Sequence, residues 1–224
     1  MMTALGEALA EAVAEPRVRV VVLAAAGKLF CAGHDLGELR ASDDPAAHQA
    51  LFDRCSTLML DIANARTPVI ARVQGAAVAA GCQLVASCDL AVAVDTAKFA
   101  VSGIDLGLFC STPGVAVGRA VGRKAAAEML LTGRFVSAAE AVSLGLINRA
   151  VPATELDTAI AETAALIAAK APDAIALGKA VFRRQIEAPL AEAYAIAGQA
   201  MTENLGFASA RTGIDGFLHR RTRG

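Results

Sequence analysis

The chain has 224 residues, a formal net charge of −1 and 55% hydrophobic residues. This length suits one domain with a large core, and the hydrophobic fraction exceeds that of an ordinary globular chain. A charge near zero, with no basic run interleaved with aromatic residues, argues against nucleic-acid binding. The longest uncharged stretch, residues 73–88, is shorter than the roughly 20 apolar residues that cross a bilayer. No membrane span is therefore predicted.

The cysteines are odd in number and show neither a C-x-x-C pair nor a Cys/His spacing typical of a metal site. We interpret them as reduced thiols, mostly buried, and expect no metal and no resident cofactor. Acidic residues interrupt the first 15 positions, which argues against a signal peptide and favours a cytoplasmic, intracellular protein. The five cysteines are Cys31, Cys55, Cys82, Cys88 and Cys110.

Apolar periodicity predicts alternating helices and buried strands in the first 100 residues. A helix marked by Leu5, Leu9 and Val13 precedes a predicted strand at 18–24. A loop then leads to a second helix, whose apolar positions lie within 51–62. Such an alternation favours an α/β fold with parallel strands. Further short apolar runs predict strands at 69–73, 90–94 and 98–100, with a helix that begins near Ala80.

After Pro113 the pattern is helical, with almost no strand. Ser137 followed by Glu140 is a capping-box pattern that supports one helix start. No linker, repeat or low-complexity segment interrupts the chain, so we expect an α/β core over 1–150 and a helical C-terminal region over 151–224 in the same compact unit. The predicted helices cover 115–121, 124–131, 137–144, 155–169, 173–186, 190–204 and 213–221.

Two segments place small residues where the backbone must turn sharply and leave amide N–H groups free. They are 30–39 (FCAGHDLGEL), expected after the strand at 18–24, and 74–90 (QGAAVAAGCQLVASCDL), expected after the strand at 69–73. Amides at two strand ends can point at one carbonyl oxygen and stabilise the charge that develops on it. The sequence therefore predicts an oxyanion hole suited to a thioester enolate.

These segments, in this order, resemble the enoyl-CoA hydratase/isomerase family, also called the crotonase family, over nearly the whole chain. The resemblance rests on FCAGHDL at 30–36, on the segment at 74–89, on LLTGRFVSAAEAVSLGLINRAVP at 130–152 and on GIDGFLHRR at 213–221. GHDL, CQLVASCDLAVA and GLFCSTPGVA indicate one particular branch of that family. The resemblance implies a ββα spiral core, a helical C-terminal trimerisation region, an acyl-CoA ligand and a homo-oligomer, either a trimer or a hexamer.

The resemblance also implies which residues form the site. The family's two oxyanion donors correspond to the backbone N–H groups of His34 and Ala80, and the first turn of a helix at Ala80 has such unpaired N–H groups. The first loop and the basic C-terminal helix, from the same or an adjacent subunit, would contact coenzyme A. A solvated helix end explains the basic residues equally well, because cations complement the helix dipole there. The implied coenzyme A contacts are Ala32, Asp35, Leu36, His219, Arg220 and Arg221.

The chain departs from the family at the two glutamates that hydratases use as base and acid. Their positions are occupied here by Gln83 and Gly103. The side-chain amide of a glutamine cannot accept a proton near neutral pH. Loss of one general acid or base lowers a catalytic rate by ~10²–10⁴-fold. Two interpretations stay open: a hydratase or isomerase with weakened hydration, and a non-catalytic acyl-CoA-binding or assembly subunit.

Possible replacements for the glutamates each have a structural alternative. Asp105 could supply a carboxylate or act as a solvated loop residue or helix cap. The His34 imidazole suits proton transfer and equally suits the edge of a coenzyme A pocket. Cys110, Ser111 and Thr112 form a polar cluster, but no partner that would activate a nucleophile is evident.

The chain also departs from the family at its start. Family members carry an opening β-hairpin before the helix that begins here near Thr3, so about 25 residues are missing by comparison with the family pattern. Two interpretations stay open: a native start upstream of Met1, or a short form of the protein. The first predicted strand would then form an open edge of its sheet.

Overall fold

One parallel sheet forms the centre of the molecule. The computed structural model describes residues 1–221, and its first sheet has the strand order β1-β3-β5-β8. The strands are β1 (Val21–Ala24), β3 (Val69–Val73), β5 (Leu90–Val94) and β8 (Arg149–Val151), all parallel. β3 and β5 have the predicted bounds, and the middle of the sheet is buried on both faces, as continuous apolar runs predict.

A second, smaller sheet lies beside the first and was not predicted. Its order is β2-β4-β6-β7, parallel except for the last pair. Only β6 (Lys98–Ala100) was expected from the sequence. The others have three residues or fewer, too few to show a pattern: β2 (Leu29–Cys31), β4 (Ala76–Val78) and β7 (Val136–Ser137). The region after Pro113 is mostly helical, as predicted, and its two short strands, β7 and β8, add one strand to each sheet.

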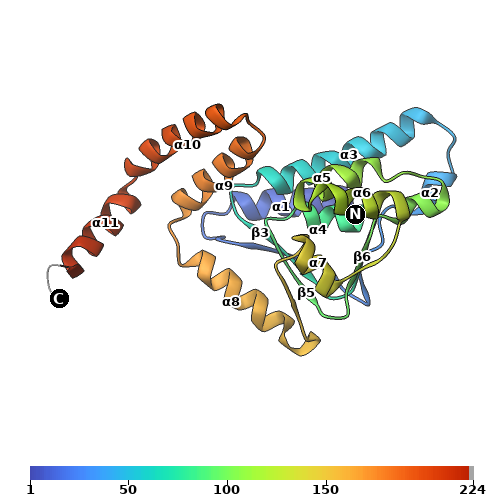
Figure 1. Ribbon diagram of the computed structural model, residues 1–224, viewed down its shortest axis with the longest axis horizontal. Helices are drawn as coiled ribbons and strands as arrows, with labels where there is room; N and C mark the ends of the chain where they lie inside the picture. Colours follow the sequence, from blue (N-terminus) through green and yellow to red (C-terminus); the bar gives the residue numbers. More distant parts are fainter. Residues whose placement is uncertain (222–224) are drawn as a thin grey trace.

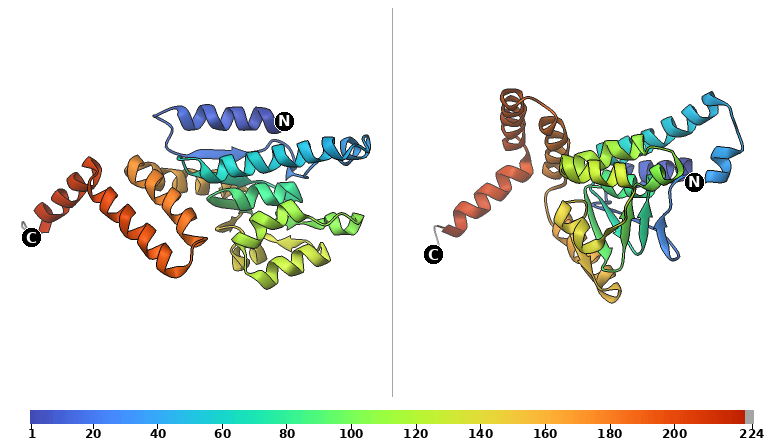
Figure 2. Two further views of the ribbon diagram at one scale, coloured as in Figure 1. Left: turned by 90° about the horizontal axis from the view of Figure 1, so that it is seen from above. Right: turned by 45° about the vertical axis from the view of Figure 1, so that its right-hand side comes forward.

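Helices cover the sheets and bury the apolar residues that the periodicity identified. α3 (Pro45–Asn64) lies between α1 (Met2–Ala14) and α4 (Ala80–Ser87), and α5 (Ser111–Ala120) packs on α4 (labels in Figure 1; order of the helices in Figure 2, left). α4 is the most enclosed helix, because all but one of its residues are buried. The site described below is built on its first turn.

Shorter helices and turns complete the body. They are α2 (Leu36–Arg40), the 3-10 turn η1 (Ser102–Leu106), α6 (Arg123–Thr132), α7 (Ala138–Leu144), the 3-10 turn η2 (Ala153–Glu155) and α8 (Leu156–Ala168). Ser137 Oγ accepts a hydrogen bond from Glu140 N at 3.2 Å, which confirms the predicted cap of α7.

The last three helices form an arm that extends from one side of the body. They are α9 (Pro172–Ile186), α10 (Leu190–Leu205) and α11 (Ala208–Arg221), and α11 lies farthest out in every view (Figures 1 and 2). We call them the C-terminal arm. No residue of α9 is buried, so polar contacts hold it to the body. Lys179 Nζ donates to Asp89 Oδ2 at 2.7 Å, and Arg183 Nη2 donates to Ser87 O at 3.3 Å.

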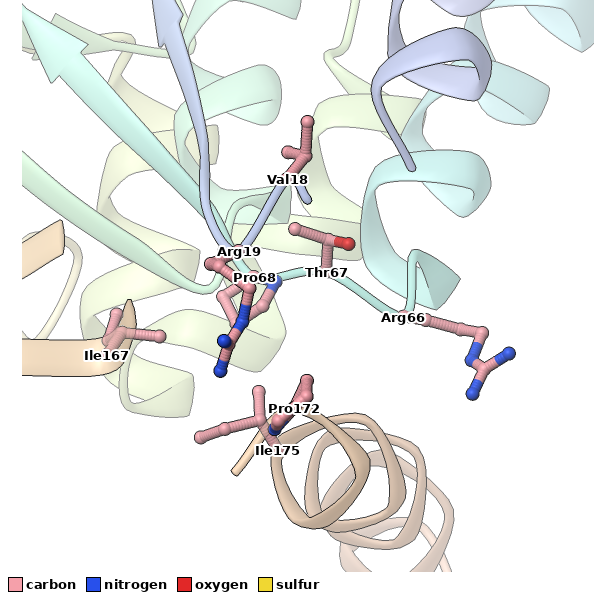
Figure 3. A pocket seen from close by; sticks show the side chains of 8 residues that line it. All are labelled: Val18, Arg19, Arg66, Thr67, Pro68, Ile167, Pro172 and Ile175. Carbon is pink, nitrogen blue, oxygen red and sulfur yellow. The ribbon is translucent and has the colours of Figure 1, made fainter. Parts of the chain in front are cut away.

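A small pocket lies where the arm leaves the body. It has a volume of about 30 Å³ and is lined in part by Arg19, Thr67, Pro68 and Ile175 (Figure 3). The guanidinium of Arg19 donates to Lys170 O beside it. This volume holds little more than one water molecule, so the pocket is not a ligand site.

Within residues 1–221 all five cysteines are free thiols, and no cluster of three or more metal-ligating side chains occurs. No described helix is long and apolar enough to cross a membrane.

Candidate functional site

The two small-residue loops meet at one edge of the second sheet. β2 and β4 pair in parallel, with Leu29 opposite Ala76 and Cys31 opposite Ala77, so their carboxyl ends lie side by side. The loops follow these short strands directly, and not the longer strands that the sequence predicted. The second sheet is therefore the element that brings the two loops together.

Glycines allow the loops to approach more closely than side chains would permit. A Cβ placed on Gly81 would lie 2.1 Å from the carbonyl oxygen of Cys31, and one on Gly33 would lie 3.3 Å from the nitrogen of Ala80. Gly33 has φ +97°, a conformation that glycine adopts without strain. The first loop thus lies against the first turn of α4.

The residue before α4 has an unusual backbone conformation. Ala79 has φ 51° and ψ −117°, and it is the one non-glycine residue with positive φ in the described chain. Its N–H donates to Ala100 O at 2.8 Å, which ties this turn to β6. Strain of this kind persists where the surrounding structure imposes it, and it concentrates at functional sites.

Both predicted oxyanion donors are backbone N–H groups without a protein acceptor. Within residues 1–221, neither the amide of His34 nor that of Ala80 donates a hydrogen bond. Ala80 is the first residue of α4, where the helix itself supplies no acceptor and the positive end of its dipole lies. The two adjoining loops thus leave N–H groups available to a ligand oxygen.

Gln83 is buried beside this turn, with 3% of its surface exposed. It follows Ala80 by three residues, so both lie on one face of α4. The thiol of Cys55, on α3, donates to Gln83 Oε1 at 3.9 Å. Gln83 Nε2 donates to no acceptor in the described part of the protein.

Gly103 lies in η1, and its surroundings leave no room for a side chain. A Cβ there would lie 2.3 Å from Leu108 O and 2.9 Å from Cys110 Sγ. Gly103 N donates to that sulfur at 3.3 Å, so the loop that leads into α5 is folded back against the glycine. The backbone therefore excludes a side chain at this position, and a substitution to glutamate cannot be accommodated without moving this loop.

Asp105 is exposed and directed toward the end of α6. A Cβ on Gly133 would lie 3.0 Å from both carboxylate oxygens of Asp105. The structure therefore favours a surface role for Asp105 over that of a replacement acid or base.

The His34 imidazole packs edge-on against Phe52 of α3, with ring centroids 5.7 Å apart and an interplanar angle of 80°. Its Nε2 is buried and has no partner in residues 1–221. Burial lowers the pKa of His34, and the nearby charge of Glu38 opposes this only in part. The ring is therefore mainly neutral at pH 7.

The first loop presents its predicted coenzyme A residues to solvent. Ala32, Asp35 and Leu36 are exposed. Asp35 caps α2, since its Oδ1 accepts from Gly37 N at 2.7 Å and from Glu38 N at 3.3 Å. The carboxylate thus has a structural role that the sequence analysis did not assign.

Within one chain the basic cluster does not approach the first loop. α11, which carries His219 and Arg220, lies at the far end of the C-terminal arm, and α2 lies at the opposite end of the molecule (Figures 1 and 2). Nδ1 of His219 lies 2.6 Å from Asp215 O, at a helix end. The side chain of Arg221 lies outside the part of the chain that is described.

Two residues of the site were missed, Cys55 and Leu108, which contribute contacts between separate elements. The small residues Ala79 and Gly81 belong to the predicted loop segment, where their size allows close approach to the backbone. The positive φ of Ala79 and the contact of Gly81 with Cys31 were not predicted. These contacts depend on packing that a single sequence does not reveal.

Comparison with known proteins identifies a family for the chain as a whole. The family model described as enoyl-CoA hydratase/isomerase matches residues 1–223. The human and rat proteins called enoyl-CoA hydratase domain-containing protein 3, mitochondrial, are 47% and 46% identical to this chain over 204 residues. The alignments cover 91% of this chain and 67% and 68% of those proteins, respectively. The branch indicated by GHDL and the two longer segments is confirmed.

Solved structures confirm the predicted fold class. An enoyl-CoA hydratase from Mycobacterium smegmatis superimposes with a TM-score of 0.96 at 55% identity, covering 98% of this chain and 86% of that one. The human enoyl-CoA hydratase domain-containing protein 3 gives a TM-score of 0.94 at 43% identity, covering 98% and 87%.

Proposed function

Because the chain belongs to the enoyl-CoA hydratase/isomerase family, we propose that it binds an acyl-CoA thioester. In this proposal the backbone N–H groups of His34 and Ala80 stabilise negative charge on the thioester oxygen. The observation that carries the proposal is that two adjoining loops leave these N–H groups without protein acceptors. Coenzyme A enters as part of the ligand, and no resident cofactor is needed.

The reaction, in this proposal, is enolate chemistry of the hydratase/isomerase type with little hydration. Gln83 cannot act as a general base, and the backbone at Gly103 excludes a side chain. A non-catalytic acyl-CoA-binding or assembly subunit is the second candidate. This second candidate is favoured because neither Gln83 nor Gly103 can transfer a proton and because Asp105 is exposed.

Calorimetric titration with butyryl-CoA tests the binding step. We expect a defined binding isotherm, while free coenzyme A, which lacks the thioester carbonyl, should bind more weakly. Failure of acyl-CoA thioesters of several chain lengths to bind the folded protein would contradict both candidate functions.

Hydration of crotonyl-CoA tests whether the residues at positions 83 and 103 limit the chemistry. We expect a rate at least about 10⁴-fold below that of a relative that carries both glutamates, since each group contributes ~10²–10⁴-fold. Gln83→Glu alone should raise it little, because the second glutamate has no room. Loss of the enoyl-thioester absorbance gives the rate. Rapid hydration that Asp105→Asn or His34→Ala abolishes would overturn this account and identify a replacement acid or base.

We also propose that the chain forms a homo-oligomer, as a trimer or a hexamer. Large apolar side chains on the C-terminal arm are exposed, for example Leu190 at 75% and Tyr194 at 73%, and exposed apolar surfaces of this kind mark interfaces. A neighbouring subunit could then supply His219 and Arg220 to the coenzyme A phosphates. Light scattering should give a trimer or hexamer mass at micromolar concentration, and a stable monomer would contradict the proposal.

The expectation of a cytoplasmic protein stays a prediction. The names of the human and rat relatives describe those proteins as mitochondrial. Fractionation of the source cells would distinguish the two locations.

A further inference from the structure

The segment that carries the first proposed oxyanion donor is held by packing. Within residues 1–221 no hydrogen bond, from backbone or side chain, involves Gly33 or His34. Gly33 has φ +97° and lies against the first turn of α4 at Ala80. The His34 ring packs against Phe52 of α3, with ring centroids 5.7 Å apart. The position of the His34 N–H therefore depends on where this ring lies.

The two nitrogens of the His34 ring have different surroundings. Nε2 is buried and has no partner in the described chain, whereas Nδ1 is not buried in this way. A neutral ring can keep its one proton on Nδ1, so that no N–H donor is buried. A protonated ring carries an N–H on both nitrogens, and a buried charged donor without an acceptor is strongly unfavourable. The place beside Phe52 therefore suits the neutral ring and not the protonated one.

The charges around the ring do little to offset this preference. Burial lowers the pKa of His34, and the opposing charge is that of Glu38 on α2, whose side chain is exposed. Burial also raises the pKa of the Cys55 and Cys82 thiols, on α3 and α4, so both stay uncharged.

The other titratable or charged groups on the neighbouring parts of β2, the first loop, α2 and α3 have partners of their own or are not fully buried. Cys31 is partly exposed, Asp35 caps α2, Arg40 pairs with Asp43 at 2.8 Å, His48 Nε2 lies 2.9 Å from Leu39 O, Asp53 accepts from Gln49 Nε2 at 2.7 Å and Arg54 is exposed. Glu38 is thus the acidic group shown to favour a charged ring, and water screens it.

We propose that the neutral His34 ring positions the His34 N–H for the thioester oxygen and that protonation of the ring releases this segment. Acyl-CoA binding is then switched by pH. This inference rests on the proposed function. His34 is a positioning residue here, because its side chain acts through its own backbone N–H and exchanges no proton with the ligand.

The direction of the pH effect follows from the form of the ring that supports binding. The pKa of His34 is lowered from about 6.5, so the neutral form prevails above that pH and is lost below the lowered pKa. Affinity for an acyl-CoA should therefore be constant from about pH 8 to 6.5. At lower pH it should fall, with a limit of about 10-fold per pH unit.

Calorimetric titration of the full chain with butyryl-CoA across this pH range tests the switch. His34→Phe keeps an aromatic ring that cannot be protonated and shares every other titrating group of protein and ligand. Between pH 7 and about pH 5 the parent protein should lose at least about 3-fold more affinity than His34→Phe. His48→Gln is the matched control, because its amide can also reach Leu39 O, and it should retain the profile of the parent protein.

Proton NMR of the parent protein measures the same switch without a variant. The His34 ring, identified by its contact with Phe52, should titrate with a pKa below about 6.5. Saturation with butyryl-CoA should lower this pKa further, because the ligand favours the neutral ring. Circular dichroism at each pH verifies that the protein is folded.

Each result has a distinct meaning. Parallel pH profiles in the parent protein and His34→Phe, or a pKa of His34 that butyryl-CoA leaves unchanged, overturn the inference and leave acyl-CoA binding intact. A folded parent protein that binds butyryl-CoA at no pH removes the proposed function itself.

Discussion

We expect Gly81→Ala to lower the melting temperature by about 2–8 °C and to weaken acyl-CoA binding at least about 10-fold. The new Cβ would lie 2.1 Å from Cys31 O and 2.8 Å from Cys31 Cβ, so the first loop must move away from α4. Overpacking of this kind costs about 1–3 kcal/mol or more, which exceeds the gain of about 1 kcal/mol in helix propensity. Displacement of the loop separates the His34 amide from that of Ala80.

Gly118→Ala is the matched control for this prediction. Gly118 is an exposed glycine of α5, and a Cβ there meets no atom within 4 Å. It should leave binding unchanged and stabilise the protein slightly. If Gly81→Ala bound acyl-CoA as tightly as Gly118→Ala, the close approach of the two loops would not matter for the ligand.

We expect Lys179→Met to lower the free energy of unfolding by about 3–5 kcal/mol. Lys179 Nζ donates to Asp89 Oδ2 at 2.7 Å and to the carbonyl oxygens of Ile62 and Thr67 at 3.3 and 3.4 Å. Only 9% of its side chain is exposed. Removing one partner of such a pair leaves the other charge poorly solvated. Because α9 has no fully buried apolar residue, the C-terminal arm should also become a target for limited proteolysis.

The exposed ion pair between Arg72 and Asp157 is the control for the Lys179–Asp89 pair. Its N–O distance is 2.6 Å, but the Asp157 side chain is 80% exposed, and pairs of this kind contribute about 0.2–1 kcal/mol. Asp157→Asn should therefore change the melting temperature little, at a fixed protein concentration. The double variant Lys179→Met with Asp89→Asn should cost less than the sum of the two single substitutions. Simple additivity would mean that the pair does not act as a unit.

The sequence predicted the elements that have a strong local pattern. The strands at 69–73 and 90–94 and the start of α4 at Ala80 lie where apolar runs and small residues placed them. The two residues proposed as oxyanion donors came from the family resemblance, and the structure then brought their loops together through β2 and β4. Those strands are too short to be predicted, and their pairing is a long-range contact.

The rest of the site depends on contacts that no local pattern encodes. The thiol of Cys55 reaches Gln83 from another helix, and Leu108 fills the space beside Gly103 through a backbone carbonyl. The sequence shows only that position 103 is a glycine where the family pattern has a glutamate. The structure shows in addition that the backbone of Leu108 occupies the space a side chain would need. A glutamate introduced at position 103 would therefore not rebuild the site.

A crystal structure with butyryl-CoA bound tests the central proposal most directly. We predict that the thioester oxygen lies within about 3 Å of the backbone nitrogens of both His34 and Ala80, as hydrogen bonds from two donors require. A complex in which the thioester binds with its oxygen away from both nitrogens would contradict the account.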